Sequence, residues 1–192
     1  MTHYPHVPKG RHLPGAQLPF TTMLRLDLAQ LARAGSAQLE TSVPAGDSLW
    51  EDSEVAFAGP VEVHLRAAYA GSGEVVVRGW LGADLRQECR RCLEPVAGRL
   101  ETEVTMTFIP GDVAGTEEDD EVRLFDPGQG EIDLREPVRE EVILAIDPYV
   151  VCSPECKGLC PQCGTNLNEG SCDCTWKEPD PRWDVLRNLR EE

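Results

Sequence analysis

Eight cysteines constrain this chain more strongly than any other feature of its sequence. Two of them flank Arg90-Arg91 as Cys89 and Cys92, and the other six fall within 23 residues, at Cys152, Cys156, Cys160, Cys163, Cys172 and Cys174. A C-x-x-C turn lets two thiolates converge on one metal ion, and zinc takes four such ligands in a tetrahedron. Eight thiols make two complete sites of four. We therefore predict two structural Zn²⁺ ions and no disulfides.

The spacing leaves the division of these cysteines into sites open. We favour one ion held by Cys89, Cys92, Cys152 and Cys156, and a second held by Cys160, Cys163, Cys172 and Cys174. The alternative joins the two C-x-x-C turns, Cys89/Cys92 with Cys160/Cys163, in a ribbon-type site. Under either division the metal ties the middle of the chain to its C-terminal part.

Other uses of clustered cysteines fit the spacing less well. The one-residue gap in Cys172-Asp173-Cys174 is not a ferredoxin spacing. A thioredoxin-like site needs a C-x-x-C after a βαβ pattern, which we do not find in this sequence. Four thiolates leave no coordination position for water, and the sequence contains no H-E-x-x-H, G-x-S-x-G or Walker motif. We predict a protein that is not an enzyme; a thiol-based redox sensor is an alternative.

The charge balance limits the class of partner. The chain has 34 Asp and Glu against 18 Lys and Arg, a net charge of −16. Nucleic-acid binders usually carry a basic surface, because neutralising phosphates drives much of their affinity. A basic protein partner is therefore expected, and a zinc-ribbon-type module that binds RNA directly is the competing hypothesis. Residues 1–19 lack the apolar core of a signal peptide, so we predict a cytoplasmic protein without a membrane partner.

The acidity is concentrated between Asp112 and Glu141. This segment contains 12 acidic residues and three arginines, a net charge of −9. Residues 111–130 are bracketed by Pro-Gly pairs and predict a mobile, solvated loop. Its simplest role is to keep the protein soluble; the functional alternative is a docking strip for a basic partner. Arg90, Arg91 and Lys157 stand beside the cysteines. They predict either compensation of thiolate charge or a small positive spot for RNA or an acidic partner.

Alternating apolar residues predict the sheet. The pattern marks strands at 23–28, 61–69, 74–81 and 100–108, and the short connections between the last three favour an antiparallel meander. A short helical turn is expected at 29–34, ended by Gly35. A longer helix is expected after Asp133, with a capping box to Glu136 and a stop at Pro148. A C-terminal helix is expected from Asp180 onward.

We predict an α+β fold: a bent antiparallel β-meander with one or two helices and a four-cysteine zinc-bound C-terminal segment. The expected organisation is a disordered N-terminal tail (1–20), an antiparallel sheet plus helix (21–149), and a zinc-binding segment with a C-terminal helix (150–192).

Five segments of the chain form recognisable motifs: Cys89–Val96, Gly130–Leu134, Glu140–Leu144, Cys152–Asn168 and Asp180–Arg182 with Trp183. Together they resemble the bacterial YceD family of large ribosomal RNA subunit accumulation proteins. The resemblance runs in the family's order from about Leu24 to Leu189. It implies a non-enzymatic role in large-subunit ribosomal RNA accumulation and ribosome biogenesis. The implied partner is a ribosomal protein or large-subunit assembly factor, with ribosomal RNA present in an assembly complex.

Overall fold

The structure of the protein, a computed structural model, describes residues 24–71, 73–111 and 123–175. The chain divides into two compact units. The first consists of residues 1–85 and 99–146, and the second of residues 86–98 and 147–192. The second unit thus takes in the segment between two strands of the expected sheet. The predicted N-terminal tail and the predicted C-terminal helix lie outside the described residues.

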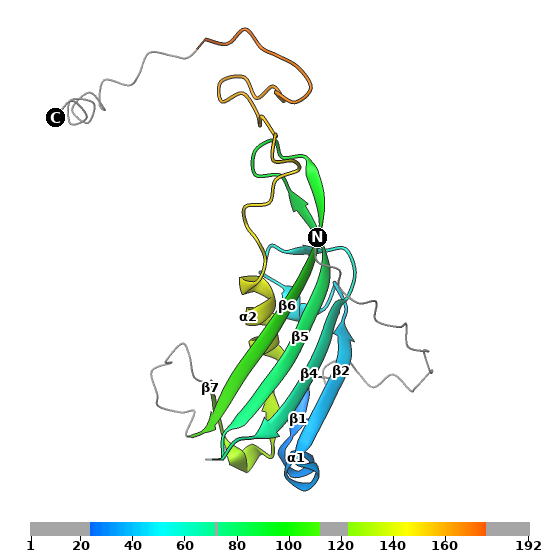
Figure 1. Cartoon of the computed structure of the whole chain (residues 1–192), viewed down its shortest axis with the longest axis vertical. Coiled ribbons are helices and arrows are strands. Elements are labelled where there is room, and N and C mark those ends of the chain that lie inside the picture. Colours follow the sequence, from blue (N-terminus) through cyan, green and yellow to red (C-terminus); the bar gives the residue numbers. More distant parts are fainter. Residues whose placement is uncertain (1–23, 72, 112–122, 176–192) are drawn as a thin grey trace, which may run out of the picture. The chain divides into compact units, whose positions relative to one another are not determined.

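A six-stranded sheet is the main layer of the first unit (Figure 1). Its order is β2-β4-β5-β6-β7, and β3 pairs with β5 off this path. The strands are β2 (Ser36–Val43), β3 (Ala56–Phe57), β4 (Val61–Tyr69), β5 (Val75–Glu88), β6 (Pro95–Pro110) and β7 (Arg123–Phe125). β4 pairs antiparallel with β5, as the meander predicts, and also with β2, which the meander did not include. The strands β5 and β6 are longer than expected, and their joined ends, 86–88 and 95–98, belong to the second unit.

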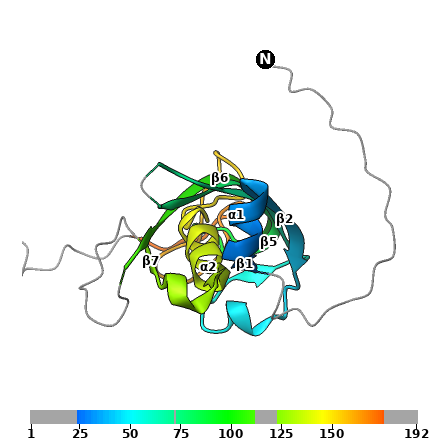
Figure 2. The same cartoon turned by 90° about the horizontal axis from the view of Figure 1, so that it is seen from below.

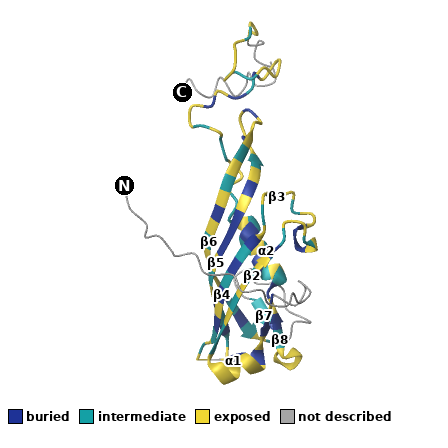
Figure 3. Ribbon diagram, turned by 90° about the vertical axis from the view of Figure 1, so that its right-hand side faces the viewer, coloured by how far each residue is buried: buried dark blue, intermediate teal, exposed yellow. Residues whose placement is uncertain are grey.

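The alternation read from the sequence builds the core of the first unit. Val61, Val63, Leu65 and Ala67 on β4 are each at most 4% exposed. Because successive residues of a strand point to opposite faces, their neighbours in β4 lie on the other face (Figure 3). The sheet curves around the two helices, whose buried side chains complete the core (Figure 2).

The first helix, α1 (Leu28–Ala34), matches the predicted helical turn. The carboxylate of Asp27 accepts a hydrogen bond from Gln30 N at 2.7 Å, which caps its first turn. The strand expected at 23–28 is only β1 (Arg25–Asp27). It pairs antiparallel with β8 (Glu131–Asp133) in a separate two-stranded sheet.

The second helix, α2 (Arg135–Leu144), begins one residue later than the predicted capping box requires. Its N-cap is Leu134, and no side chain caps it. The carboxylate of Asp133 accepts instead from Arg135 N at 2.9 Å. The capping box is therefore wrong, because Asp133 is the last residue of β8 and is held opposite Arg25.

Two further expectations about the sheet are corrected. The sheet is not wholly antiparallel, because β7 joins β6 in parallel register, with Phe108 opposite Arg123. Parallel pairing needs a longer connection than a hairpin does, and residues 111–122 supply it. The strand β2 was not predicted, since few of its residues are apolar. Within the predicted loop 111–130, β7 and the short helix η3 (Pro127–Gln129) are ordered, and residues 112–122 are outside the described part.

Neither of the helices that the structure describes is long and apolar enough to cross a lipid bilayer. A short 3-10 helix, η2 (Ser48–Trp50), completes the elements.

Candidate metal centres

The eight cysteines are free thiols that gather in two groups of four. The first centre consists of Cys89, Cys92, Cys152 and Cys156, and the second centre of Cys160, Cys163, Cys172 and Cys174. Within each centre the Sγ atoms all lie within 4.8 Å of one another. The spacing left this division open; the structure groups the thiols in the way that we favoured and not in the ribbon-type alternative. Both centres belong to the second unit.

The turn between β5 and β6 presents half of the first centre. Cys89 N donates to Glu94 O, and Leu93 N donates to Cys89 O, both at 2.8 Å. These bonds curl the chain so that Cys89 and Cys92 point the same way. Their Sγ atoms lie 3.8 Å from Cys156 Sγ and 3.6 Å from Cys152 Sγ, respectively.

Burial separates the first centre from solvent. Cys89, Cys92 and Cys156 are at most 5% exposed, and only Cys152 is exposed. Burial acts to raise the pKa of Cys89, but hydrogen bonds from the backbone of Cys152, Cys92 and Arg91 outweigh it and lower the pKa to about 6. The pKa of Cys152 rises to about 12, first because of its hydrogen bonds with the thiols of Cys92 and Cys156. Four close thiols cannot all ionise without a cation between them, which a metal ion would provide.

The second centre is built on the same turn. Cys160 N donates to Thr165 O at 2.8 Å, and Gly164 N donates to Cys160 O at 2.9 Å. Here Cys163 and Cys174 are exposed. The Thr165 hydroxyl, 3.1 Å from Cys163 Sγ, is the largest cause that lowers the pKa of Cys163 to about 6. The neighbouring Cys163 thiol is the largest cause that raises the pKa of Cys174 to about 12.

The two turns differ at the residue after the second cysteine. Gly164 has a φ of 74°, and Leu93 occupies the corresponding position with a φ of 62°. Glycine adopts this left-handed conformation freely, whereas a residue with a Cβ pays about 1 kcal/mol or more. A glycine after a C-x-x-C turn is a sequence signal for a positive φ, whereas leucine carries none, so the strain at Leu93 is evident only from the structure.

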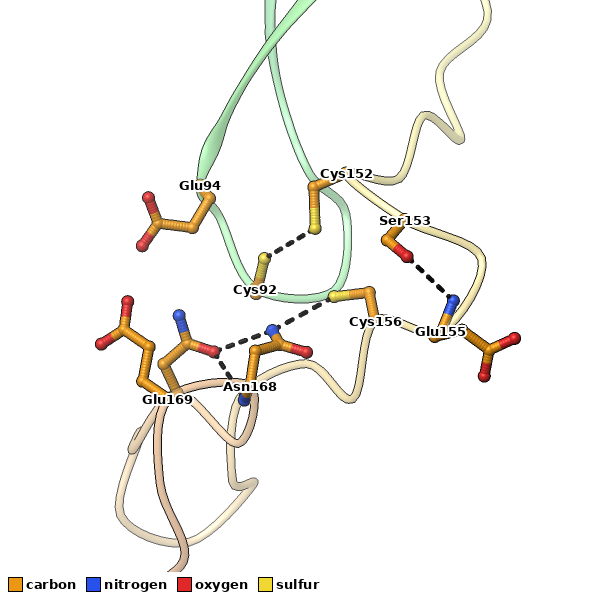
Figure 4. A pocket seen from close by; sticks show the side chains of 9 residues that line it. Cys92, Glu94, Cys152, Ser153, Glu155, Cys156, Asn168 and Glu169 are labelled. Atoms are coloured by element: carbon orange, nitrogen blue, oxygen red, sulfur yellow. Dashed lines mark hydrogen bonds between the residues drawn. The ribbon is translucent and has the colours of Figure 1, made fainter.

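Asn168 supports the first centre and was given no role by the sequence. Its Nδ2 lies 3.4 Å from Cys156 Sγ (Figure 4). Its Oδ1 accepts a hydrogen bond from Lys157 N at 2.8 Å. The signal that could have revealed it is Asn166-Leu167-Asn168 directly after the second turn, since Asn side chains readily bond nearby backbone. Asn168 and three carboxylates, Glu94, Glu155 and Glu169, also line a pocket of about 360 Å³ beside this centre.

Two of the basic residues singled out in the sequence pack within the second unit. The Arg90 guanidinium lies 4.4 Å from the centroid of the Tyr149 ring. Arg91 Nη1 donates to Cys156 O at 3.0 Å and to Pro154 O at 3.3 Å. Arg91 thus holds the chain around Cys156 against the Cys89–Cys92 turn. Charge compensation of the thiolates is in keeping with this position.

A β-sheet protein with two closed four-cysteine centres, each able to hold a metal ion, is the class that the fold and sites define. Four thiolates occupy all the coordination positions of a tetrahedral ion, so such centres suit a structural role. Residues 77–190 match the sequence model of the family described as large ribosomal RNA subunit accumulation protein YceD. The chain therefore belongs to the YceD family.

Known relatives extend this match. Uncharacterized proteins of Mycobacterium bovis and Mycobacterium tuberculosis are 34% identical over 183 residues, which cover 92% of this chain and 86% of theirs. The large ribosomal RNA subunit accumulation protein YCED homolog 1, chloroplastic, of Arabidopsis thaliana is 43% identical over 68 residues, 35% of this chain and 21% of the plant protein. No solved structure shows a significant match.

Proposed function

We propose that this protein is a non-enzymatic factor in the accumulation of large-subunit ribosomal RNA, and that it acts by binding a ribosomal protein or an assembly factor. Membership of the YceD family carries this proposal. The plant relatives whose names record large ribosomal RNA subunit accumulation support it. The two closed thiolate centres fit a binding protein better than a hydrolase, because they leave no coordination site for a substrate or water.

The metal in both centres is proposed to be zinc. Four ligands about 2.3 Å from one ion define a tetrahedron with edges of about 3.8 Å. The Sγ–Sγ distances of 3.8 Å (Cys89 to Cys156) and 3.6 Å (Cys92 to Cys152) in the first centre agree with this edge length. When bound, zinc supplies a fixed crosslink with no redox chemistry. A reducing cytoplasm is part of the proposal, since it keeps thiolates available to metal.

The proposed docking surface is the acidic strip 112–141, which carries a net charge of −9. In its described part, Arg123 is already paired with Glu140 and Glu141. The carboxylates beyond these pairs offer charge complementarity to a basic ribosomal protein.

Depletion of the protein from cells tests the proposed role. The expected result is a fall in the ratio of large-subunit to small-subunit ribosomal RNA, restored by the wild-type chain. An unchanged ratio would contradict the function.

Affinity capture of ribosomal particles at low and high salt tests the strip. The variant E117Q/E118Q/E121Q is expected to lose the salt-sensitive part of the association. A control with three equivalent changes outside the strip, E51Q/D52N/E54Q, should behave as wild type. If the strip variant associates at low salt as strongly as the wild type, the strip is not the docking surface.

A further inference from the structure

The face of the sheet that points away from the helices carries two neighbouring cross-strand pairs of side chains. One pair is aromatic (the aromatic rung) and the other consists of two arginines (the arginine rung). The β4–β5 register places His64 opposite Trp80 and, two residues along, Arg66 opposite Arg78. Val63 and Leu65, the residues on either side of His64 in β4, point into the core. All four side chains therefore share the outer face of the first unit.

The aromatic rung is a preformed stack. The His64 and Trp80 rings lie 4.2 Å apart at an interplanar angle of 11°, and Trp80 is 37% exposed. Gly82 leaves room for the indole, because a Cβ there would meet the Trp80 ring at 2.8 Å. Exposed aromatic rings fixed on a sheet are surfaces on which unpaired bases stack.

The arginine rung is electrostatically unfavourable in the free protein. Like charges directly opposite each other across two strands destabilise a sheet. Among the described residues, neither Arg66 nor Arg78 has an ion-pair partner, and Arg66 makes one long hydrogen bond, 3.5 Å, to Ser36 Oγ. Arg99, by contrast, binds three carboxylates on the same sheet, those of Glu62, Asp84 and Glu101. In a chain with so many acidic residues, an unpaired arginine rung points to an external anion.

We propose that this outer face of β4 and β5 binds single-stranded RNA. A base stacks on the His64–Trp80 pair, and a backbone phosphate lies between Arg66 and Arg78. The two rungs are about 7 Å apart along the strands, a distance that one nucleotide can span. Glu40, opposite His64 on β2, repels phosphate and bounds the site on that side.

The aromatic rung favours RNA over an acidic protein. Carboxylates would use only the arginines, whereas a nucleotide uses both rungs. The choice of RNA over DNA rests on the proposed function. The local patch also reconciles RNA contact with the net charge of −16, since binding depends on the charges that meet the phosphates.

Fluorescence anisotropy with the full-length, zinc-loaded protein and a labelled oligouridylate of roughly 10 nucleotides tests the site. Trp80→Ala should weaken binding by roughly 5- to 100-fold through loss of stacking, and Trp80→Phe should retain most of it. The double variant R66Q/R78Q should reduce the salt dependence by about 1.4 in log–log slope, about 0.7 for each contact. Arg33→Gln, on α1 outside the patch, is the matched control and should leave the slope unchanged.

Crosslinking the wild-type protein to 5-bromouridine RNA locates the contact without any variant. Trypsin cuts after Arg78 and Arg86, so the crosslink should fall in the peptide 79–86, which contains Trp80. Crosslinks confined to 150–175 would overturn the inference in favour of the cysteine-rich segment. No binding by the wild type at low salt would also overturn it, as would binding by W80A and R66Q/R78Q that is as strong as that of the wild type. So would competition by polyglutamate as strong as that by RNA.

The two proposals fail in different assays. If the oligonucleotide does not bind but depletion still lowers large-subunit ribosomal RNA, only the RNA site is wrong. If depletion leaves ribosomal RNA unchanged, the proposed function is wrong whatever the oligonucleotide does.

Discussion

The first and second centres use the same C-x-x-C turn in two different ways. The first joins residues 60 and 67 positions apart in sequence and buries three of its four cysteines. The second is contained within 160–174, and two of its cysteines are exposed. A crosslink that closes a long loop removes more chain entropy than one that closes a short loop. The first centre therefore organises the second unit, whereas the second orders one local loop.

Metal removal should have the largest effect of the changes considered, and it should act on the second unit and not on the sheet. Residues 150–175 contain few buried apolar side chains, so without metal they should lose their protection from amide hydrogen exchange. The strands β4 and β5 should stay protected through their own core. Hydrogen exchange before and after chelation, followed by mass spectrometry, measures both. Retained protection across 152–168 in the metal-free protein would contradict a metal-dependent unit.

Loss of one cysteine ligand should destabilise the protein to a different extent at each centre. Cys89→Ser removes a fully buried ligand from the long-range crosslink and should lower the free energy of unfolding by about 4 kcal/mol or more. Cys163→Ser should lose one metal ion with a smaller loss of stability, because its centre is local and exposed. Native mass spectrometry gives the metal count, and urea denaturation gives the stability. Equal losses from the two variants would remove the distinction between the centres.

The hydrogen bonds to sulfur should tune each centre separately. Asn168→Ala removes a donor to Cys156 Sγ and should weaken metal binding at the first centre by about 10- to 100-fold. Thr165→Val removes the hydroxyl beside Cys163 Sγ and is the matching change at the second centre. Competition with a chromophoric chelator measures both affinities. Each variant should change one centre, and a change in both centres from either variant would show that they are coupled.

The smallest expected effect concerns the residue after each turn. Leu93→Gly relieves a left-handed leucine that is 58% exposed, and should change stability by no more than about 1 kcal/mol, in the stabilising direction. Gly164→Leu imposes the same strain on the second turn and should destabilise by about 1–2 kcal/mol. Thermal unfolding of both variants measures the difference. A large loss from Leu93→Gly would mean that this side chain makes a contact essential to folding.

Local patterns accounted for a good part of the fold. The alternation in 61–69 predicted the buried face of β4, and Gly35 after an apolar turn predicted the end of α1. The pattern missed β2, because that strand's place in the sheet depends on its pairing with β4 and less on its own residues. The capping box at Asp133 failed for the same kind of reason, since pairing with β1 holds that residue in β8.

The sequence by itself determined the chemistry of this protein. It supplies eight thiols in two sets, an acidic strip, and strands in which the alternation of apolar and polar residues marks the buried face. Residue type and short spacing are enough for these, because they depend on neighbours along the chain. Only the tertiary structure decided that Cys89 and Cys92 join Cys152 and Cys156, and that Arg66 stands opposite Arg78. Distant segments meet through the register and packing of the whole chain, which no local spacing encodes.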